Sequence, residues 1–138
     1  MDIATEVYQR IVSAKIFIDE NFDQQLDLDI ISRQSCISRF HFHRLFTRIY
    51  RKTPHQYLTK KRIDNAKLML ADDDLSVSEI CNNVGFESIG SFSILFKRQI
   101  GFAPQYYRNL AFAKKQLAKK QPKAFIPHCF IETYKLDR

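Results

Sequence analysis

The sequence contains few of the residues that interrupt or cross-link a chain. Its 138 residues include three glycines, four prolines, three cysteines and no tryptophan. It has no Asn-Gly or Asp-Gly hairpin signal and no long alternation of apolar and polar residues, which argues against a β-sheet. The cysteines are too few and too widely spaced for a disulfide framework, which favours free thiols and a cytoplasmic protein.

Several signals of chemistry are also missing. No apolar run approaches the ~18 residues of a membrane span, and no signal-peptide pattern opens the chain. No phosphate-binding loop, dinucleotide-binding glycine pattern or nucleophile elbow occurs. His41 and His43 point about 200° apart on a helix, and His128-Cys129 lacks partners at ligand spacing. We therefore expect no enzyme, cofactor, metal site or membrane contact.

Charge is divided unevenly along the chain. The net charge is +7. Residues 1–36 carry three basic and seven acidic side chains, a net of −4, while the remainder carries 19 basic and eight acidic ones, a net of +11. Residues 39–62 hold eight basic side chains and no acidic one. Such a block is either a solvated helix face or a surface for a polyanion.

Apolar spacing and capping residues predict about seven helices. A stripe formed by Ile3, Val7, Ile11, Ala14 and Ile18 predicts the first, over about 5–21. Six further starts are marked by Asp27, Ser38, Thr53-Pro54, Ser76 with Glu79 as a capping box, Ser88 and Ala103-Pro104. The expected apolar contacts of the helix over 54–71 are Tyr57, Ile63, Ala66, Leu68 and Leu70. Those of the helix after Ser38 are Phe42, Leu45, Phe46 and Ile49.

An internal repeat relates the two halves of the chain. Seven residues recur at an offset of 49 for the first pair and 50 for the others: Ile31, Phe42, Leu45, Phe46, Arg48, Pro54 and Tyr57 match Ile80, Phe92, Leu95, Phe96, Arg98, Pro104 and Tyr107. Each unit is a short helix, a tight turn and a longer helix, which is the helix-turn-helix plan. The plainer alternative is a helical hairpin, which the basic block makes less attractive.

The turns of the two units differ. Gly85 can adopt positive φ in the second turn, whereas Cys36 occupies the first and is expected to cost some turn stability. The second unit carries the more specific pattern: Ser76–Cys81, Val84–Phe86, Phe92, Phe96–Arg98, Gly101, Pro104 and Tyr107-Arg108. Across roughly residues 5–108 the sequence resembles the DNA-binding domain of the AraC/XylS family of bacterial regulators.

The resemblance implies two recognition helices that enter DNA major grooves, joined by a long linking helix. A helix over 54–71 is about 27 Å long, and adjacent major-groove faces lie about 34 Å apart. Half a domain at each end of such a helix brings two reading helices to one turn of DNA.

The family pattern places base contacts of the first unit at Phe40, His43 and Arg44. Arg44 can fork onto guanine, which contributes about 1–3 kcal/mol of discrimination, and Phe40 packs either on a thymine methyl or in the core. The second-unit base contacts are predicted at Ile89, Gly90, Ser91 and Ser93. Because the repeat maps Arg44 to Ile94, the first unit is expected to dominate base-specific readout.

Phosphate contacts are expected from polar and basic residues around the recognition helices, with helix N-termini adding backbone amides. These residues are Ser38, Arg39, Arg48, Lys52, Lys97, Arg98 and Arg108.

The sequence therefore predicts an all-α fold with two homeodomain-like helix-turn-helix subdomains. These are residues 1–52 and 73–110, with a linker helix over 53–72 and a basic, apolar tail over 111–138 that either folds back or self-associates. The predicted function is a stand-alone, sequence-specific regulator of transcription that binds double-stranded DNA as a monomer and has no effector domain. Activation is the assumed role, and RNA polymerase is the candidate second partner. The alternative is a basic helical adaptor that binds an acidic protein or RNA.

Overall fold

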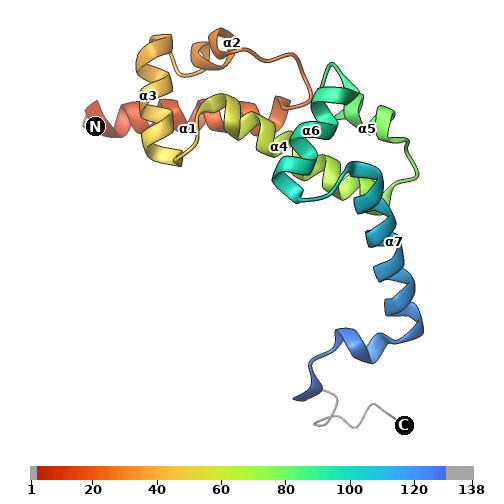
Figure 1. Cartoon of the computed structure of the whole chain (residues 1–138). Helices are drawn as coiled ribbons and strands as arrows, with labels where there is room; N and C mark the ends of the chain where they lie inside the picture. Colours follow the sequence, from red (N-terminus) through yellow and green to blue (C-terminus); the bar gives the residue numbers. More distant parts are fainter. Residues whose placement is uncertain (1–2, 130–138) are drawn as a thin grey trace.

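The computed structural model describes residues 3–129, and within that range its regular secondary structure is all helical (Figure 1), as the sequence predicts. Seven α-helices and one short 3-10 helix follow in the order α1 (Ile3–Asn21), α2 (Leu28–Arg33), α3 (Arg39–Tyr50), α4 (Pro54–Asp72), α5 (Val77–Asn83), α6 (Ile89–Ile100), α7 (Pro104–Lys120) and η1 (Pro122–Phe125). Within the described range, no helix combines the length and apolarity needed to cross a membrane.

Side-chain caps start five of these helices where the sequence predicts them. The capping oxygens belong to Asp27, Ser38, Thr53, Ser76 and Ser88, and each accepts the backbone N–H three residues later at 2.8–3.4 Å. The position of the capping box is a correction. It forms at Thr53, whose N–H donates to Gln56 Oε1 at 2.9 Å, while Ser76 makes only its own half with Glu79. Glu79 is exposed, and its charged carboxylate gains little by exchanging water for a backbone donor.

Each unit has its own core, and the two cores repeat the same aromatic packing. The Phe42 and Phe46 rings lie 5.6 Å apart, and those of Phe92 and Phe96 lie 5.7 Å apart. A tyrosine from the next helix meets the second ring edge-on in both units, at 5.7 Å for Phe46–Tyr57 and for Phe96–Tyr107. The aromatic residues that recur at the 50-residue offset therefore make the same ring contacts in both units.

Two expected core residues are exposed instead. Leu68 is 62% exposed on α4, and Ile49 is 40% exposed at the end of α3. The helix α4 buries Leu58 in the first core and Ile63 in the second, so its apolar face serves two units and Leu68 faces neither. At the end of α3 the core is closed by Tyr50, whose ring lies 4.6 Å from Phe46.

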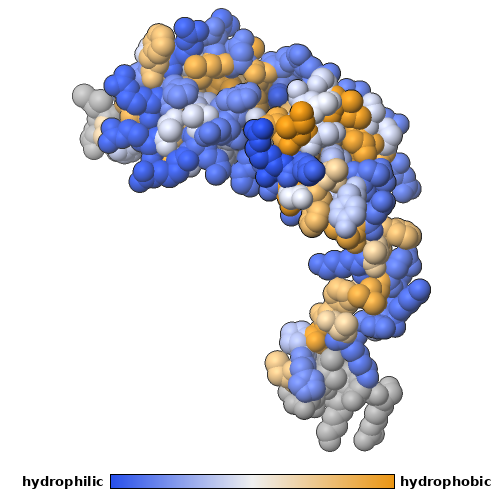
Figure 2. All heavy atoms as spheres, viewed as in Figure 1, coloured by the Kyte–Doolittle hydropathy of each residue, from blue (hydrophilic) through white to orange (hydrophobic). Residues whose placement is uncertain are grey.

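The helix α7 begins in the second unit and then extends away from it (Figure 1). As predicted, it continues through the lysine-rich segment and ends before Pro122. Lys115 donates to the Ala71 carbonyl and pairs with Asp72 at 2.9 Å, which attaches the middle of α7 to the end of α4. Hydrophobic and hydrophilic side chains lie next to one another along its projecting part (Figure 2). Much of the predicted apolar segment 125–136 lies outside the described residues.

Candidate nucleic-acid interface

The helix α3 presents a mixed aromatic and basic surface. It buries Phe42 and Phe46 completely, so the opposite face is exposed. Phe40 is 74% exposed, which rules out the alternative that it belongs to the core. Together with four other side chains it lines a shallow hollow of about 430 Å³, the others being His43, Arg44, Thr47 and Arg48. The residues predicted to read bases in the first unit therefore lie side by side.

Two polar residues of this surface are already engaged. The Thr47 hydroxyl donates to the His43 carbonyl at 2.7 Å. Arg39 pairs with Asp29 of α2 at 3.1 Å, and its guanidinium lies 5.2 Å from the centre of the Phe40 ring. Both partners of that ion pair are exposed, so it contributes less than about 1 kcal/mol. Arg39 is therefore held only weakly by Asp29.

The matching surface of α6 carries no charge on its first two turns. Ser88 caps the helix with its hydroxyl, and exposed Ile89, Gly90 and Ser91 follow. Ile94, the counterpart of Arg44, is 62% exposed, and Ser93 is half-buried. A Cβ atom at Gly90 would meet nothing closer than 3.9 Å, so this start of α6 leaves room for close approach of a ligand.

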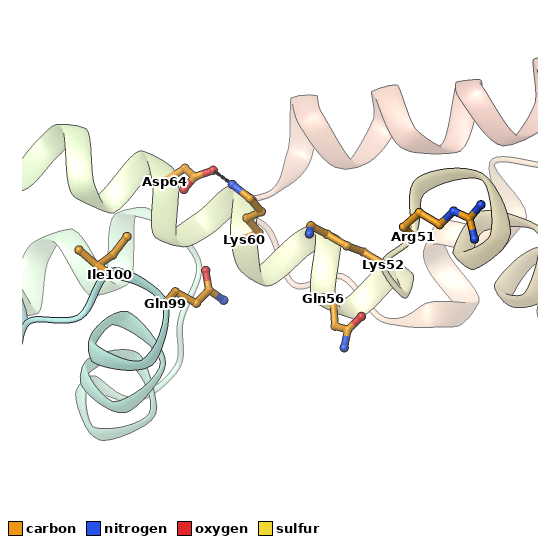
Figure 3. A pocket seen from close by; sticks show the side chains of 7 residues that line it. All are labelled: Arg51, Lys52, Gln56, Lys60, Asp64, Gln99 and Ile100. Carbon is orange, nitrogen blue, oxygen red and sulfur yellow. Dashed lines mark hydrogen bonds and ion pairs between the residues drawn. The ribbon is translucent and has the colours of Figure 1, made fainter.

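The other basic residues predicted to hold phosphates differ in their surroundings. Arg48, Lys97 and Arg98 are exposed on the recognition helices. Lys52 lines a hollow of about 520 Å³ beside α4 (Figure 3). That hollow is also lined by Arg51, Gln56, Lys60, Asp64, Gln99 and Ile100.

Arg108, also predicted to hold a phosphate, is engaged inside the protein. Its guanidinium donates to the carbonyl oxygens of Leu70, Asp73 and Leu75, at 3.2 Å for Leu70 and 3.4 Å for Asp73. These carbonyls end α4 and the segment after it, where a helix leaves acceptors without partners. Arg108 therefore fastens α7 to α4 inside the second unit through Nε and Nη2.

His55 lies between the two recognition helices, and no sequence motif marks it. It lines one hollow with His43 and a second, of about 400 Å³, with Ser88 and Ser91. The signal available in the sequence was its place in the first turn of the linking helix, directly after Pro54 and inside the basic block. No local pattern in the sequence distinguishes that place from a solvated one.

One half-buried polar cluster belongs to the first unit alone. The Tyr57 hydroxyl donates to Asp19 at 2.6 Å, and Lys15 pairs with the same carboxylate at 2.8 Å. Burial favours a higher pKa for Asp19, but the hydrogen bonds from Lys15 and Tyr57 and the charge of Lys61 outweigh it and lower that pKa. Burial, followed by the bond to Asp19, raises the pKa of Tyr57 to about 12.

Comparison with known proteins agrees with this geometry. Residues 31–110 match a family described as a helix-turn-helix domain. The chain is 32% identical over 100 residues to the melibiose operon regulatory protein of Escherichia coli K12, a match that covers 72% of the chain and 33% of that protein. The chain thus spans about a third of that relative's length. It is 29% identical over 103 residues to the regulatory protein SoxS of the same strain, which covers 74% of the chain and 96% of SoxS.

Among solved structures, the chain superposes on the DNA-binding domain of AdpA, a global transcriptional factor in complex with a target DNA. The TM-score is 0.70 at 26% identity, and the match covers 81% of this chain and 96% of that one.

Proposed function

The chain belongs to the AraC/XylS family of helix-turn-helix transcription regulators, and we propose that it places α3 and α6 in successive major grooves of double-stranded DNA. The observation that carries this proposal is the repeated packing of the two units on one helix. Both recognition helices are capped by serine and held by the same Phe–Phe–Tyr contacts. The 19-residue α4 that joins them is about 28 Å long, and with part of a unit at each end it spans about one turn of DNA.

In this proposal the two helices have different roles. Phe40, His43 and Arg44 read base edges, because an exposed arginine can fork onto guanine and an exposed ring can cover a thymine methyl. Ile89, Gly90, Ser91 and Ser93 give the second groove close but weakly selective contact. Ser38, Arg39, Arg48, Lys52, Lys97 and Arg98 hold phosphates, with sequence-independent attraction that salt weakens.

A single copy carries both recognition helices, so we propose that it binds DNA as a monomer. We also propose that it acts in the cytoplasm and without catalysis. One surface away from α3 and α6 suits a protein partner such as RNA polymerase. Tyr8, Val12 and Ile16 form an exposed apolar stripe along α1, and such stripes on soluble proteins often mark protein contacts.

A gel shift with the full chain tests the proposal. A random-sequence duplex at 50 and 200 mM salt is compared with a single-stranded RNA and with an acidic polypeptide. We expect retention of the duplex at low salt and a loss of roughly 100-fold or more in affinity at high salt, because several counterions are released. Preferential binding of RNA or of the acidic polypeptide would overturn the proposal and favour the adaptor.

A double variant on α3 tests whether this helix contacts the duplex. Arg44→Ala and Arg48→Ala together should weaken duplex binding, because both arginines line the α3 hollow. Arg10→Ala is the matched control, since Arg10 pairs with Glu6 on α1 at 2.7 Å and should not contact the duplex. Equal losses from the double variant and from the control would exclude α3 as the binding surface.

A further inference from the structure

The two helix-turn-helix units are linked by α4 and also contact each other directly around Arg62. Arg62 of α4 donates from Nε to the Phe22 carbonyl at 2.7 Å and from Nη2 to the Gln24 carbonyl at 2.7 Å. Both carbonyls belong to the segment that joins α1 to α2 in the first unit. The same guanidinium lies 5.7 Å from the centre of the Phe86 ring in the second unit. Arg62 thus contacts the two units at once.

Two further features show how closely the units approach here. The Phe22 side chain packs against both hydrophobic cores. Gly85, in the turn of the second unit, has φ +94°, and a Cβ atom there would lie 2.9 Å from the Phe22 carbonyl oxygen and 3.0 Å from Arg62 Nε. Glycine is needed at this turn for its φ and also because the backbone of the other unit leaves no room for a side chain.

We propose that Arg62 and Gly85 form a junction that fixes the second helix-turn-helix unit relative to the first, and so sets the spacing between the two DNA half-sites. This inference rests on the proposed function. One added base pair moves a half-site by about 3.4 Å and turns it by about 35°. A unit on a loose junction can follow such a displacement. A unit held by the two Arg62 hydrogen bonds and by the backbone contact at Gly85 cannot.

Binding to DNA of altered spacing tests the junction. A site selected from a random pool is remade with one base pair added or removed between its halves, and affinities are measured by fluorescence anisotropy. We expect the wild-type chain to lose roughly tenfold or more at either altered spacing, the scale of a lost base contact. Arg62→Met, which keeps an apolar stem over Phe86, should lose less than about threefold.

Arg108→Met is the matched control, because Arg108 makes the same kind of bonds to carbonyls but only within the second unit. It should keep the spacing selectivity of the wild type. Arg62→Met with unchanged spacing selectivity, or Arg108→Met with an equal loss of selectivity, would overturn the assignment.

Two glycine variants test the backbone contact separately. Gly85→Ala and Gly101→Ala both place a side chain at positive φ, but nothing lies within 4 Å of a Cβ at Gly101. Gly85→Ala should therefore change the preferred spacing or abolish the preference, and Gly101→Ala should leave it unchanged. The same preference in both variants would contradict the proposal.

A measurement without DNA separates this inference from the proposed function. Spin labels at Arg33→Cys and Asn82→Cys, exposed on α2 and α5, report the distance between units when Cys36 and Cys129 are replaced by Ser. We expect a narrow distance distribution for the otherwise wild-type chain and a broader one with Arg62→Met. A broad distribution with Arg62 intact would overturn the junction even if DNA binds, and a narrow one would support it even if DNA does not.

Discussion

The first and second helix-turn-helix units have the same interior and different surfaces. In both, two phenylalanines and one tyrosine hold the recognition helix at matching ring distances. On the exposed faces, the position of Arg44 in the first unit is occupied by Ile94 in the second. Burial constrains the volume and shape of the aromatic residues, whereas an exposed position contributes little to folding. The reading surfaces could therefore diverge without any change of architecture.

The turns show a second difference with a physical reason. Cys36 in the first turn has φ +55°, in the left-handed region that favours glycine, and its side chain is exposed. Gly85 in the second turn has φ +94° and faces the backbone of the other unit. A side chain at the first turn costs only backbone strain, while one at the second would also collide with Phe22.

The largest effect should come from the shared interior. Phe46→Ala and Phe96→Ala should each reduce the free energy of unfolding by about 3–5 kcal/mol, because each leaves a cavity in a closed core. Since Phe22 packs against both cores, either variant should lower one common thermal transition, measured by circular dichroism. Phe40→Ala is the control and should change stability by less than about 0.5 kcal/mol. Separate thermal transitions for the two units would contradict the expectation that the two cores unfold together.

The exposed faces should differ next most strongly. Arg44→Ala should weaken binding to a selected duplex by about 10-fold to 100-fold, since a forked contact to guanine contributes about 1–3 kcal/mol. Ile94→Ala, at the matched position of α6, should weaken it less than about threefold, as expected for one apolar contact in a weakly selective head. Fluorescence anisotropy at fixed salt measures both, and a larger loss for Ile94→Ala would reverse the assigned roles.

The polar cluster of the first unit should make its stability depend on pH. The folded-state pKa of Asp19 lies below its ordinary value of 3.8, so its stabilisation is present above that value and is lost as pH falls through the folded pKa. Asp19→Asn should destabilise by about 1 kcal/mol at pH 7, a figure reduced by partial solvation, and the difference should shrink in acid. Asp64→Asn, in an exposed pair with Lys60, should show neither effect in urea titrations.

The smallest effect concerns the first turn. Cys36→Gly should raise the free energy of unfolding by about 0.5–1 kcal/mol, because glycine adopts positive φ without the steric cost of a Cβ. Urea unfolding at pH 7 measures the change. Reduced stability would mean that the Cys36 side chain makes a contact that outweighs its strain.

Local features of the fold were predictable from the sequence, and features set by tertiary contacts were not. Capping residues act within one turn of chain, so five helix starts were predicted correctly. The exposure of Leu68 depends on α4 serving two cores, which periodicity within one helix does not reveal. The roles of Arg62 and Arg108 depend on carbonyls more than 30 residues away in sequence. In a basic block, an arginine that fastens two units together looks the same as one that holds phosphate.

The central claim is that α3 carries the base-specific readout and α6 mainly positions the chain. Selection of bound sequences from a random duplex pool tests it most directly, with the wild type and Arg44→Ala run in parallel. We expect a strong base preference, including guanine, in one half-site and a weak preference about one helical turn away. Arg44→Ala should lose the guanine preference and keep the weak half. Equal preferences in both half-sites, or a pattern unchanged by Arg44→Ala, would contradict the claim.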